Sequence, residues 1–143
     1  MQSEVIVRQY EQTDWLYLSE LLYEGYNSQI DKKTLETEYL GPKKNILIAE
    51  YDDRVVGTFF WEVQEDYVRP HKTLYLTYLV VKNEYRRQGI ARKLCKKMEE
   101  ISRKQKCDSI EFTSANYRTN AHALYKSLGY SIKDTSIFIK EAL

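Results

Sequence analysis

The chain has 143 residues, of which 43% are hydrophobic and 30% charged, so it is long enough for one domain with a buried core. This composition and a formal net charge of +1 exclude an intrinsically disordered protein. No apolar run approaches the roughly 20 residues of a membrane-spanning helix, and the N-terminus lacks the layout of a signal peptide. Cys95 and Cys107 fit neither a metal site nor a disulfide framework. We therefore expect a single domain, residues 1–143, with reduced thiols and a cytoplasmic location, without a membrane partner.

The first 81 residues predict a strand, two helices and three further strands. Apolar side chains recur at helical spacing after Thr13-Asp14, a favourable helix start. Asp52-Asp53 separates two β-rich runs, which predicts a hairpin. The last run, TLYLTYLVV, is almost wholly apolar and is typical of a central strand. The predicted ranges are, in order, 4–10, 15–23, 32–39, 45–51, 54–63 and 73–81.

The remaining residues predict a basic helix, a strand, a second helix and a last strand. Ile90, Leu94, Met98 and Ile101 form one apolar stripe, which indicates a helix with one buried face. The later elements are expected at 109–114, 116–128 and 130–140, with Gly129 ending the helix. The order β-α-α-β-β-β-α-β-α-β is typical of an α/β domain in which helices cover a sheet.

Charge is unevenly distributed along the chain. Residues 1–81 carry 8 basic and 14 acidic side chains, whereas residues 82–106 carry 10 basic and 3 acidic ones. A basic block can bind nucleic acid or an anionic cofactor, or can simply form a solvated helix face. Nucleic acid is a remote alternative, because Tyr85 is the only aromatic residue in the block.

The stretch YRRQGIARKL, residues 85–94, places three arginines and one glycine at the start of the predicted basic helix. Arginines are electrostatically unfavourable there unless an anion is bound, because the free backbone N–H groups already carry positive partial charge. A glycine lets such an anion approach the main chain closely. The GxGxxG and GxxxxGK[ST] loops are both excluded, because Gly89 is the only glycine between Gly57 and Gly129. Some other phosphate-binding loop is therefore predicted.

The run LVVKNEYRRQGIARKL resembles the acetyl-CoA motif of the GNAT superfamily of N-acetyltransferases, whose pattern is [Q/R]-x-x-G-x-[G/A]. The later run NAHALYKSLGY is similar to a second family signature, A-x-x-x-Y-x-x-x-G-[F/Y]. The matching residues are Arg86, Gly89 and Ala91 in the first motif, and Ala121, Tyr125, Gly129 and Tyr130 in the second. The resemblance implies one N-acetyltransferase domain with a mixed, mostly antiparallel sheet flanked by helices.

The resemblance also implies acetyl-CoA as acetyl donor and no metal. The pyrophosphate would lie on the amides of the basic helix, and the pantetheine arm would pair with the end of the preceding strand. An asparagine often contacts this arm in the family, but Arg118 occupies its position here, so Asn116 or Asn120 would have to substitute. The residues assigned to the cofactor are Leu79, Val80, Val81, Arg86, Arg87, Gln88, Gly89, Ile90, Ala91, Arg92 and Asn120.

The implied reaction is attack of an amine on the acetyl thioester. A main-chain N–H near residues 79–81 would bind the oxyanion, and Tyr125 matches the position of a family general acid. The base is open: an ungapped match gives Thr113, so Glu111, two residues earlier on the same strand face, is the first candidate. Glu62 and water-mediated deprotonation are alternatives.

The acidic first half of the chain suits a cationic acceptor, either a small amine or a peptide amine. The residues expected to contact it are Glu20, Glu24, Asp31, Trp61 and Tyr78, with Tyr23, Tyr26, Tyr67 and Tyr75 also available. A non-catalytic module that senses coenzyme A is the main alternative function. Family members often form homodimers, and nothing in this sequence specifies one.

Overall fold

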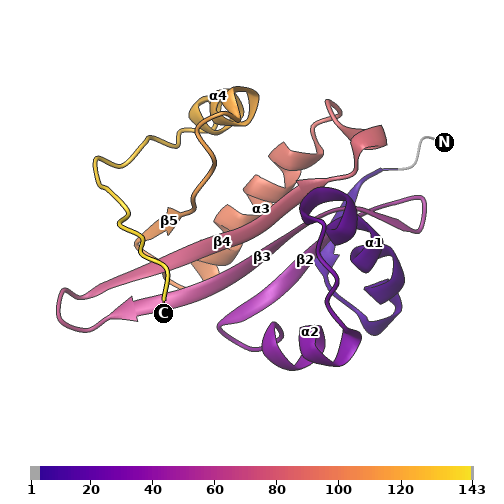
Figure 1. Ribbon diagram of the computed structural model, residues 1–143, viewed down its shortest axis with the longest axis horizontal. Helices are drawn as coiled ribbons and strands as arrows, with labels where there is room; N and C mark the ends of the chain where they lie inside the picture. Colours follow the sequence, from indigo (N-terminus) through magenta and orange to yellow (C-terminus); the bar gives the residue numbers. More distant parts are fainter. Residues whose placement is uncertain (1–3, 143) are drawn as a thin grey trace. The chain divides into compact units, whose positions relative to one another are not determined.

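The structure is a computed structural model that describes residues 4–142. The chain divides into two compact units, Met1–Thr113 and Ser114–Leu143. The first unit contains, in order, β1 (Ile6–Gln9), η1 (Gln12–Asp14), α1 (Trp15–Tyr26), α2 (Lys32–Glu38), β2 (Lys44–Tyr51), β3 (Arg54–Asp66), β4 (His71–Val81), η2 (Asn83–Tyr85), α3 (Ile90–Lys104) and β5 (Ser109–Glu111). The second unit contains α4 (Thr119–Ser127) (Figure 1). No helix among the described residues is long and apolar enough to cross a lipid bilayer.

A five-stranded sheet in the order β1-β2-β3-β4-β5 forms the centre of the first unit. The first three pairs of neighbours are antiparallel, and β5 joins β4 in parallel. Asp52 and Asp53 connect β2 to β3 with φ values of 52° and 61°, as a tight hairpin turn requires. The predicted α/β class and the mixed, mostly antiparallel sheet are therefore confirmed.

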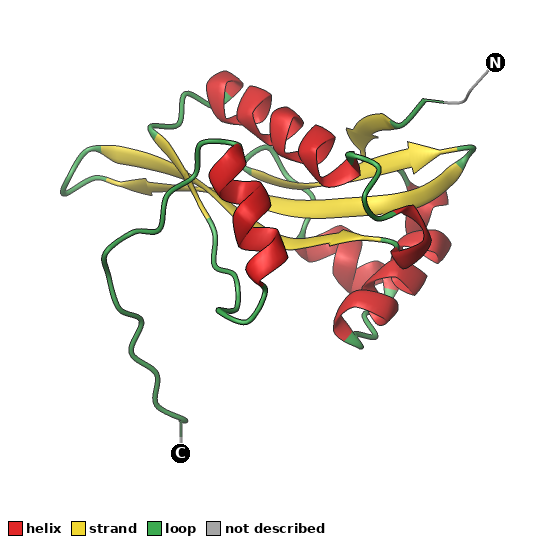
Figure 2. Cartoon of the chain, turned by 90° about the horizontal axis from the view of Figure 1, so that it is seen from above, coloured by secondary structure: helices red, strands yellow, loops and turns green. Residues whose placement is uncertain are grey.

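Helices cover both faces of this sheet. The apolar residues of α1 and α2 pack over β2, β3 and β4, in a core that includes Leu18, Leu35, Ile48 and Phe60. α3 lies on the opposite face (Figure 2), and Ile90, Leu94 and Met98 of its predicted stripe are buried. A Cβ atom on Gly57 of β3 would lie 3.2 Å from Ile90, so the glycine allows the first turn of α3 to approach the sheet closely.

The predicted last strand, residues 130–140, is wrong, because residues 130–142 form neither helix nor strand. The β-forming run Ile137-Phe138-Ile139 has the propensity of a strand, but a strand also needs a neighbour for its N–H and C=O groups. Strand 109–114 is likewise shorter than predicted, since β5 pairs with β4 over three residues only. The helix expected from residue 116 begins at Thr119, after a turn in which the Arg118 N–H donates to the Ala115 carbonyl.

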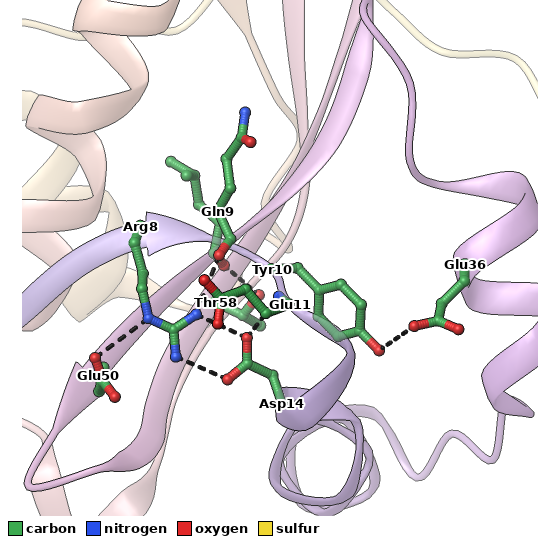
Figure 3. Close-up of polar contacts among 9 residues, drawn as sticks. Arg8, Gln9, Tyr10, Glu11, Asp14, Glu36, Glu50 and Thr58 are labelled. Carbon is green, nitrogen blue, oxygen red and sulfur yellow. Dashed lines mark hydrogen bonds and ion pairs between the residues drawn. The ribbon is translucent and has the colours of Figure 1, made fainter.

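Arg8 joins β1 to η1 and to β2 through charged hydrogen bonds (Figure 3). Its Nη1 and Nη2 atoms each lie 2.8 Å from one oxygen of Asp14, and its Nε donates to Glu50 at 3.2 Å. Asp14 is buried and also accepts from the Glu11 N–H at 2.8 Å. Burial opposes ionisation of Asp14, but these hydrogen bonds and the Arg8 charge outweigh it and lower the pKa of the carboxyl below its usual value.

We expect Asp14→Asn to lower the free energy of unfolding by about 1–3 kcal/mol at pH 7. A carboxyl whose folded-state pKa is lowered stabilises the fold above its unfolded pKa of about 3.9 and loses this contribution as the pH falls through the folded value. The difference between variant and wild type should therefore shrink below about pH 4. Urea unfolding at pH 7, 5 and 3 measures it, with the exposed Asp134→Asn as control. An equal loss at all three pH values would contradict the role of the charge.

Candidate active site

The strand β4 is irregular where it crosses the middle of β3. The register places two residues of β4, Tyr78 and Leu79, opposite Phe59 alone, which is the pattern of a β-bulge. Tyr78 has a φ of 54°, a left-handed conformation that is costly for a residue with a side chain. The bulge therefore marks the start of the segment predicted to hold acetyl-CoA.

Beyond the bulge, one edge of β4 carries no strand within the described residues of the first unit. β5 pairs with β4 only over Thr73–Tyr75. On the other side, the Lys82 N–H donates to the Val56 carbonyl at 2.8 Å, continuing the ladder with β3. Antiparallel pairing alternates, so the main-chain groups of Leu79 and Val81 point away from β3, toward the open edge.

Two side chains bind the outward carbonyls of this edge. The Tyr26 hydroxyl, at the end of α1, donates to the Leu79 carbonyl at 3.0 Å. Arg86 Nε donates to the Val81 carbonyl at 3.3 Å. The outward carbonyls of this edge therefore already accept hydrogen bonds from side chains. The N–H groups of Leu79 and Val81 point outward from the same edge. Such an edge favours a ligand that brings carbonyl oxygens.

The chain then enters the loop Arg86–Gly89 and the first turn of α3. Arg87 and Gly89 have φ values of 63° and 78°, and a Cβ atom on Gly89 would meet nothing within 4 Å. The Lys93 N–H donates to the Gly89 carbonyl at 3.1 Å, so the N–H groups of residues 90–92 precede the first helical hydrogen bond. The arginines at 86, 87 and 92 are all exposed. Open space, first-turn amides and positive charge together fit a pyrophosphate.

The two candidate bases lie in one row across the sheet. Glu62 on β3 pairs in register with Tyr75 on β4, and Tyr75 pairs with Glu111 on β5. Side chains directly opposite one another point to the same face of a sheet, and Glu62 shares its face with Phe60, two residues away. Both carboxylates therefore belong to the face that α1 and α2 cover. Glu62 is exposed and Glu111 is half-buried.

The residues predicted to bind the acceptor do not come together. Glu20 and Glu24 line a surface hollow that also contains Arg54 and Lys82, two cations that offset their charge. Glu24 also accepts a hydrogen bond from the Asn83 N–H at 3.2 Å.

Trp61 and Asp31 have other surroundings. Trp61 is buried and, as the neighbour of Phe60 in β3, points to the opposite face of the sheet. Asp31 caps α2, since its carboxylate accepts from the Thr34 N–H and hydroxyl at 2.9 and 2.6 Å. Of the predicted acceptor residues, Tyr78 belongs to an aromatic cluster beside the open edge, together with Tyr26, one of the tyrosines that the sequence left available.

That cluster, the aromatic row, consists of Tyr39, Phe60, Tyr78 and Tyr26. Its successive ring centroids are 5.1, 5.2 and 5.3 Å apart, and each pair meets edge to face. Tyr26 was available from the sequence only as one of many tyrosines, and Tyr39 was not considered for the site. No sequence signal identifies them, because four separate elements supply the rings.

The second unit carries the second signature. Tyr125 is a half-buried residue of α4 whose ring meets that of Tyr130 edge to face at 6.5 Å. Its carbonyl accepts from the Tyr130 N–H at 3.0 Å, and Gly129 has a φ of 95°, so the glycine ends the helix as predicted. Asn120 lies exposed in the first turn, directly after Thr119.

The remaining chemistry-bearing residues do not form a second centre. Among residues 4–142, no three His, Cys, Asp or Glu side chains are grouped to hold a metal ion. Cys95 is buried in α3, and this burial raises the pKa of its thiol to about 11. His71 Nε2 lies 2.9 Å from the Ser109 hydroxyl, near the start of β5.

A profile of the Acetyltransferase (GNAT) family matches residues 9–130. Human N-acetyltransferase 8B is 34% identical over 91 residues, which cover 64% of this chain and 40% of that protein. Human N-acetyltransferase 8 is 29% identical over 109 residues, which cover 76% of this chain and 48% of that protein. The chain thus aligns with less than half of the length of these relatives.

Solved structures agree on the fold. The aminoglycoside N-acetyltransferase AAC(6')-Iy, in complex with CoA, matches with a TM-score of 0.86 at 18% identity, over 100% of this chain and 98% of that one. The Trypanosoma brucei acetyltransferase Tb11.01.2886 matches with a TM-score of 0.80 at 18% identity, over 96% of this chain and 100% of that one. Because the family profile covers most of the sequence, the chain belongs to the GNAT family of acetyltransferases.

Proposed function

We propose that this protein is an acetyl-CoA-dependent N-acetyltransferase that acetylates a primary amine, either on a small cationic molecule or on a peptide. The observation that carries the proposal is the path of β4, whose bulged, open-edged end leads directly into a glycine-containing loop and the amides of α3. The similar aminoglycoside N-acetyltransferase, solved with CoA, supports both the donor and an amine acceptor.

The cofactor residues follow from the resemblance and fit the geometry. The N–H groups of Leu79 and Val81 would pair with the carbonyls of the pantetheine arm, and the amides of residues 90–92 would bind the pyrophosphate. The arginines at 86, 87 and 92 would balance the phosphate charge. Asn120 remains a proposed contact from the sequence motif alone.

When bound, acetyl-CoA supplies an acetyl thioester for attack by the amine. An N–H of the β4 edge would donate to the developing oxyanion. Tyr125 would donate the proton of its hydroxyl to the departing sulfur. Glu111 is the proposed base, and Glu62, on the other side of Tyr75 in the same row, is the alternative.

Gly89→Glu should abolish acetyl-CoA binding, because it places a carboxylate in the open space where the phosphates would lie. Gly129→Glu is a matched control, since Gly129 also has a positive φ and open space around it but lies outside the loop. Both variants should lose a similar amount of stability, about 1–2 kcal/mol, from the left-handed backbone. Calorimetry with acetyl-CoA decides, and unchanged affinity in Gly89→Glu would refute the proposed loop.

Acetyl-CoA-dependent thiol release with a panel of amines tests the function itself. The panel contains polyamines, aminoglycosides, amino acids, and peptides with free N-termini or lysines. We expect release with one class of amine, and we expect Tyr125→Phe to lower kcat at least tenfold with little change in acetyl-CoA affinity, as loss of an acid does. Acetyl-CoA binding without release from any amine would instead favour the coenzyme A-sensing module. If Tyr125→Phe keeps the wild-type kcat, Tyr125 is a packing residue and not the general acid.

We also propose that two copies of the chain associate. Residues 130–142 expose Ile132, Ile137, Phe138 and Ile139 at 74–93% of their surface. Exposed β-forming segments and open sheet edges pair readily between chains.

The free thiols of Cys95 and Cys107 fit the reducing cytoplasm, where we propose that the protein acts.

Phe138→Asp should weaken such a dimer, because a charge replaces an apolar side chain in the paired segment. Sedimentation equilibrium over a range of concentrations measures the effect. We expect wild-type protein to be dimeric and the variant to be mostly monomeric. A monomeric wild type at every concentration would contradict the proposal.

A further inference from the structure

The aromatic row begins beside the open edge of β4, at Tyr26 and Tyr78. Tyr26 connects the row to this edge, since its hydroxyl donates to the Leu79 carbonyl and its ring contacts that of Tyr78. Phe60, buried beneath, and then Tyr39, at the end of α2, continue the row. Tyr26 and Tyr78 keep 36% and 43% of their surface exposed, so part of the row is available to a ligand.

Two carboxylates, those of Glu38 and Glu62, lie near Tyr39. Glu62 lies on the same face as Phe60, two residues along β3, and Glu38 is the last residue of α2, next to Tyr39. Burial, the neighbouring Tyr78 hydroxyl and then the charges of Glu38 and Glu62 raise the pKa of Tyr39, so its phenol remains a neutral partner. Lys44 stands opposite Glu62 on β2 and offsets one of the two negative charges.

This combination of aromatic faces and carboxylates is suited to a cation. The face of an aromatic ring attracts an ammonium group, and a nearby carboxylate adds to the attraction. The strained φ of Tyr78 holds its ring within this row, at the bulge itself. Strain that fixes a side chain beside a reacting edge is a common mark of a functional position.

The cation held there is not the group that reacts. An amine must lose its proton before it attacks a thioester, so a subsite that stabilises an ammonium would oppose the reaction of that same nitrogen. We propose that the aromatic row, with Glu62 and Glu38, binds a second, non-reacting ammonium group of the acceptor. The preferred acceptor is then a diamine or polyamine, and this inference rests on the acetyl transfer proposed above.

Two amines of the same shape, one of which carries a permanent charge, test the subsite. (3-Aminopropyl)trimethylammonium and its carbon isostere, 4,4-dimethylpentan-1-amine, each carry one primary amine that can be acetylated. We expect wild-type kcat/KM to be about tenfold higher for the cation, in line with a partly exposed cation–π site. Tyr78→Leu and Glu62→Gln should each lower this ratio below its wild-type value, whereas Tyr78→Phe, which keeps the ring, should largely preserve it.

Tyr23→Leu is the matched control, because Tyr23 is an exposed tyrosine of the same helix as Tyr26 but is not part of the row. Its ratio should equal that of wild type. A wild-type ratio near one, or a ratio that survives both Tyr78→Leu and Glu62→Gln, would overturn the subsite.

A binding measurement separates this inference from the proposed function. Calorimetry of the two amines with the CoA-loaded protein reports the subsite even if neither amine is acetylated. Absence of transfer would count against the proposed function, and the subsite would then be tested by the binding measurement alone. Tighter binding of the cation in wild type, lost in Tyr78→Leu and kept in Tyr23→Leu, supports it. Equal binding of cation and isostere overturns it.

Discussion

The bulge at Tyr78 and Leu79 is the constraint on which the rest of the site depends. It places two residues of β4 against one of β3 and so interrupts the regular ladder in the middle of the sheet. On one side of the strand it brings Tyr78 into the aromatic row, and beyond it the strand continues as an edge with outward main-chain groups. That edge leads within a few residues to the loop and first turn of α3. A regular strand would lack the extra residue of the bulge, so the aromatic row and the open edge would not have these positions along β4.

Much of the first unit was predictable because its signals are local. Helical spacing of leucines, an apolar stripe in α3 and an Asp-Asp turn between two β-rich runs all act over a few residues, and the corresponding elements form as expected. The start of α3 directly after Gly89 was also predictable, because the apolar stripe begins at Ile90. The predicted strand at 130–140 failed because its existence depends on a partner elsewhere in the chain.

The arrangement around the bulge could not be predicted for the same reason. A positive φ at Tyr78 follows from the register with β3, and a register is a long-range property. The aromatic row joins α1, the end of α2, β3 and β4, whose order in the sequence gives no sign of their contact. Glu20 and Glu24 are a second example of a long-range effect. The surplus of acidic residues in the sequence suggested a cation site there, but Arg54 and Lys82 lie beside them in the fold.

The two charge regions of the sequence have distinct places in the first unit. The basic residues gather around the loop and α3, where an anion fits, whereas Glu62 and Glu38 lie on the face that carries the aromatic row. The end of β4 lies between them. A donor with phosphates and an acceptor with ammonium groups would then approach this strand from regions of opposite charge, which favours the encounter of each with its own side.

The burial of Cys95 has a consequence for the protein's own chemical durability. The reaction proposed here releases a free thiol at every turnover. Such thiols exchange with protein disulfides, and the disulfides that they form on oxidation are attacked by protein thiolates. Because burial raises the pKa of its thiol to about 11, Cys95 is almost entirely protonated at pH 7. The residue within the helix that would bind the donor is therefore nearly inert toward mixed-disulfide formation and alkylating reagents, and the protein can handle a reactive sulfur compound without being modified by it at this position.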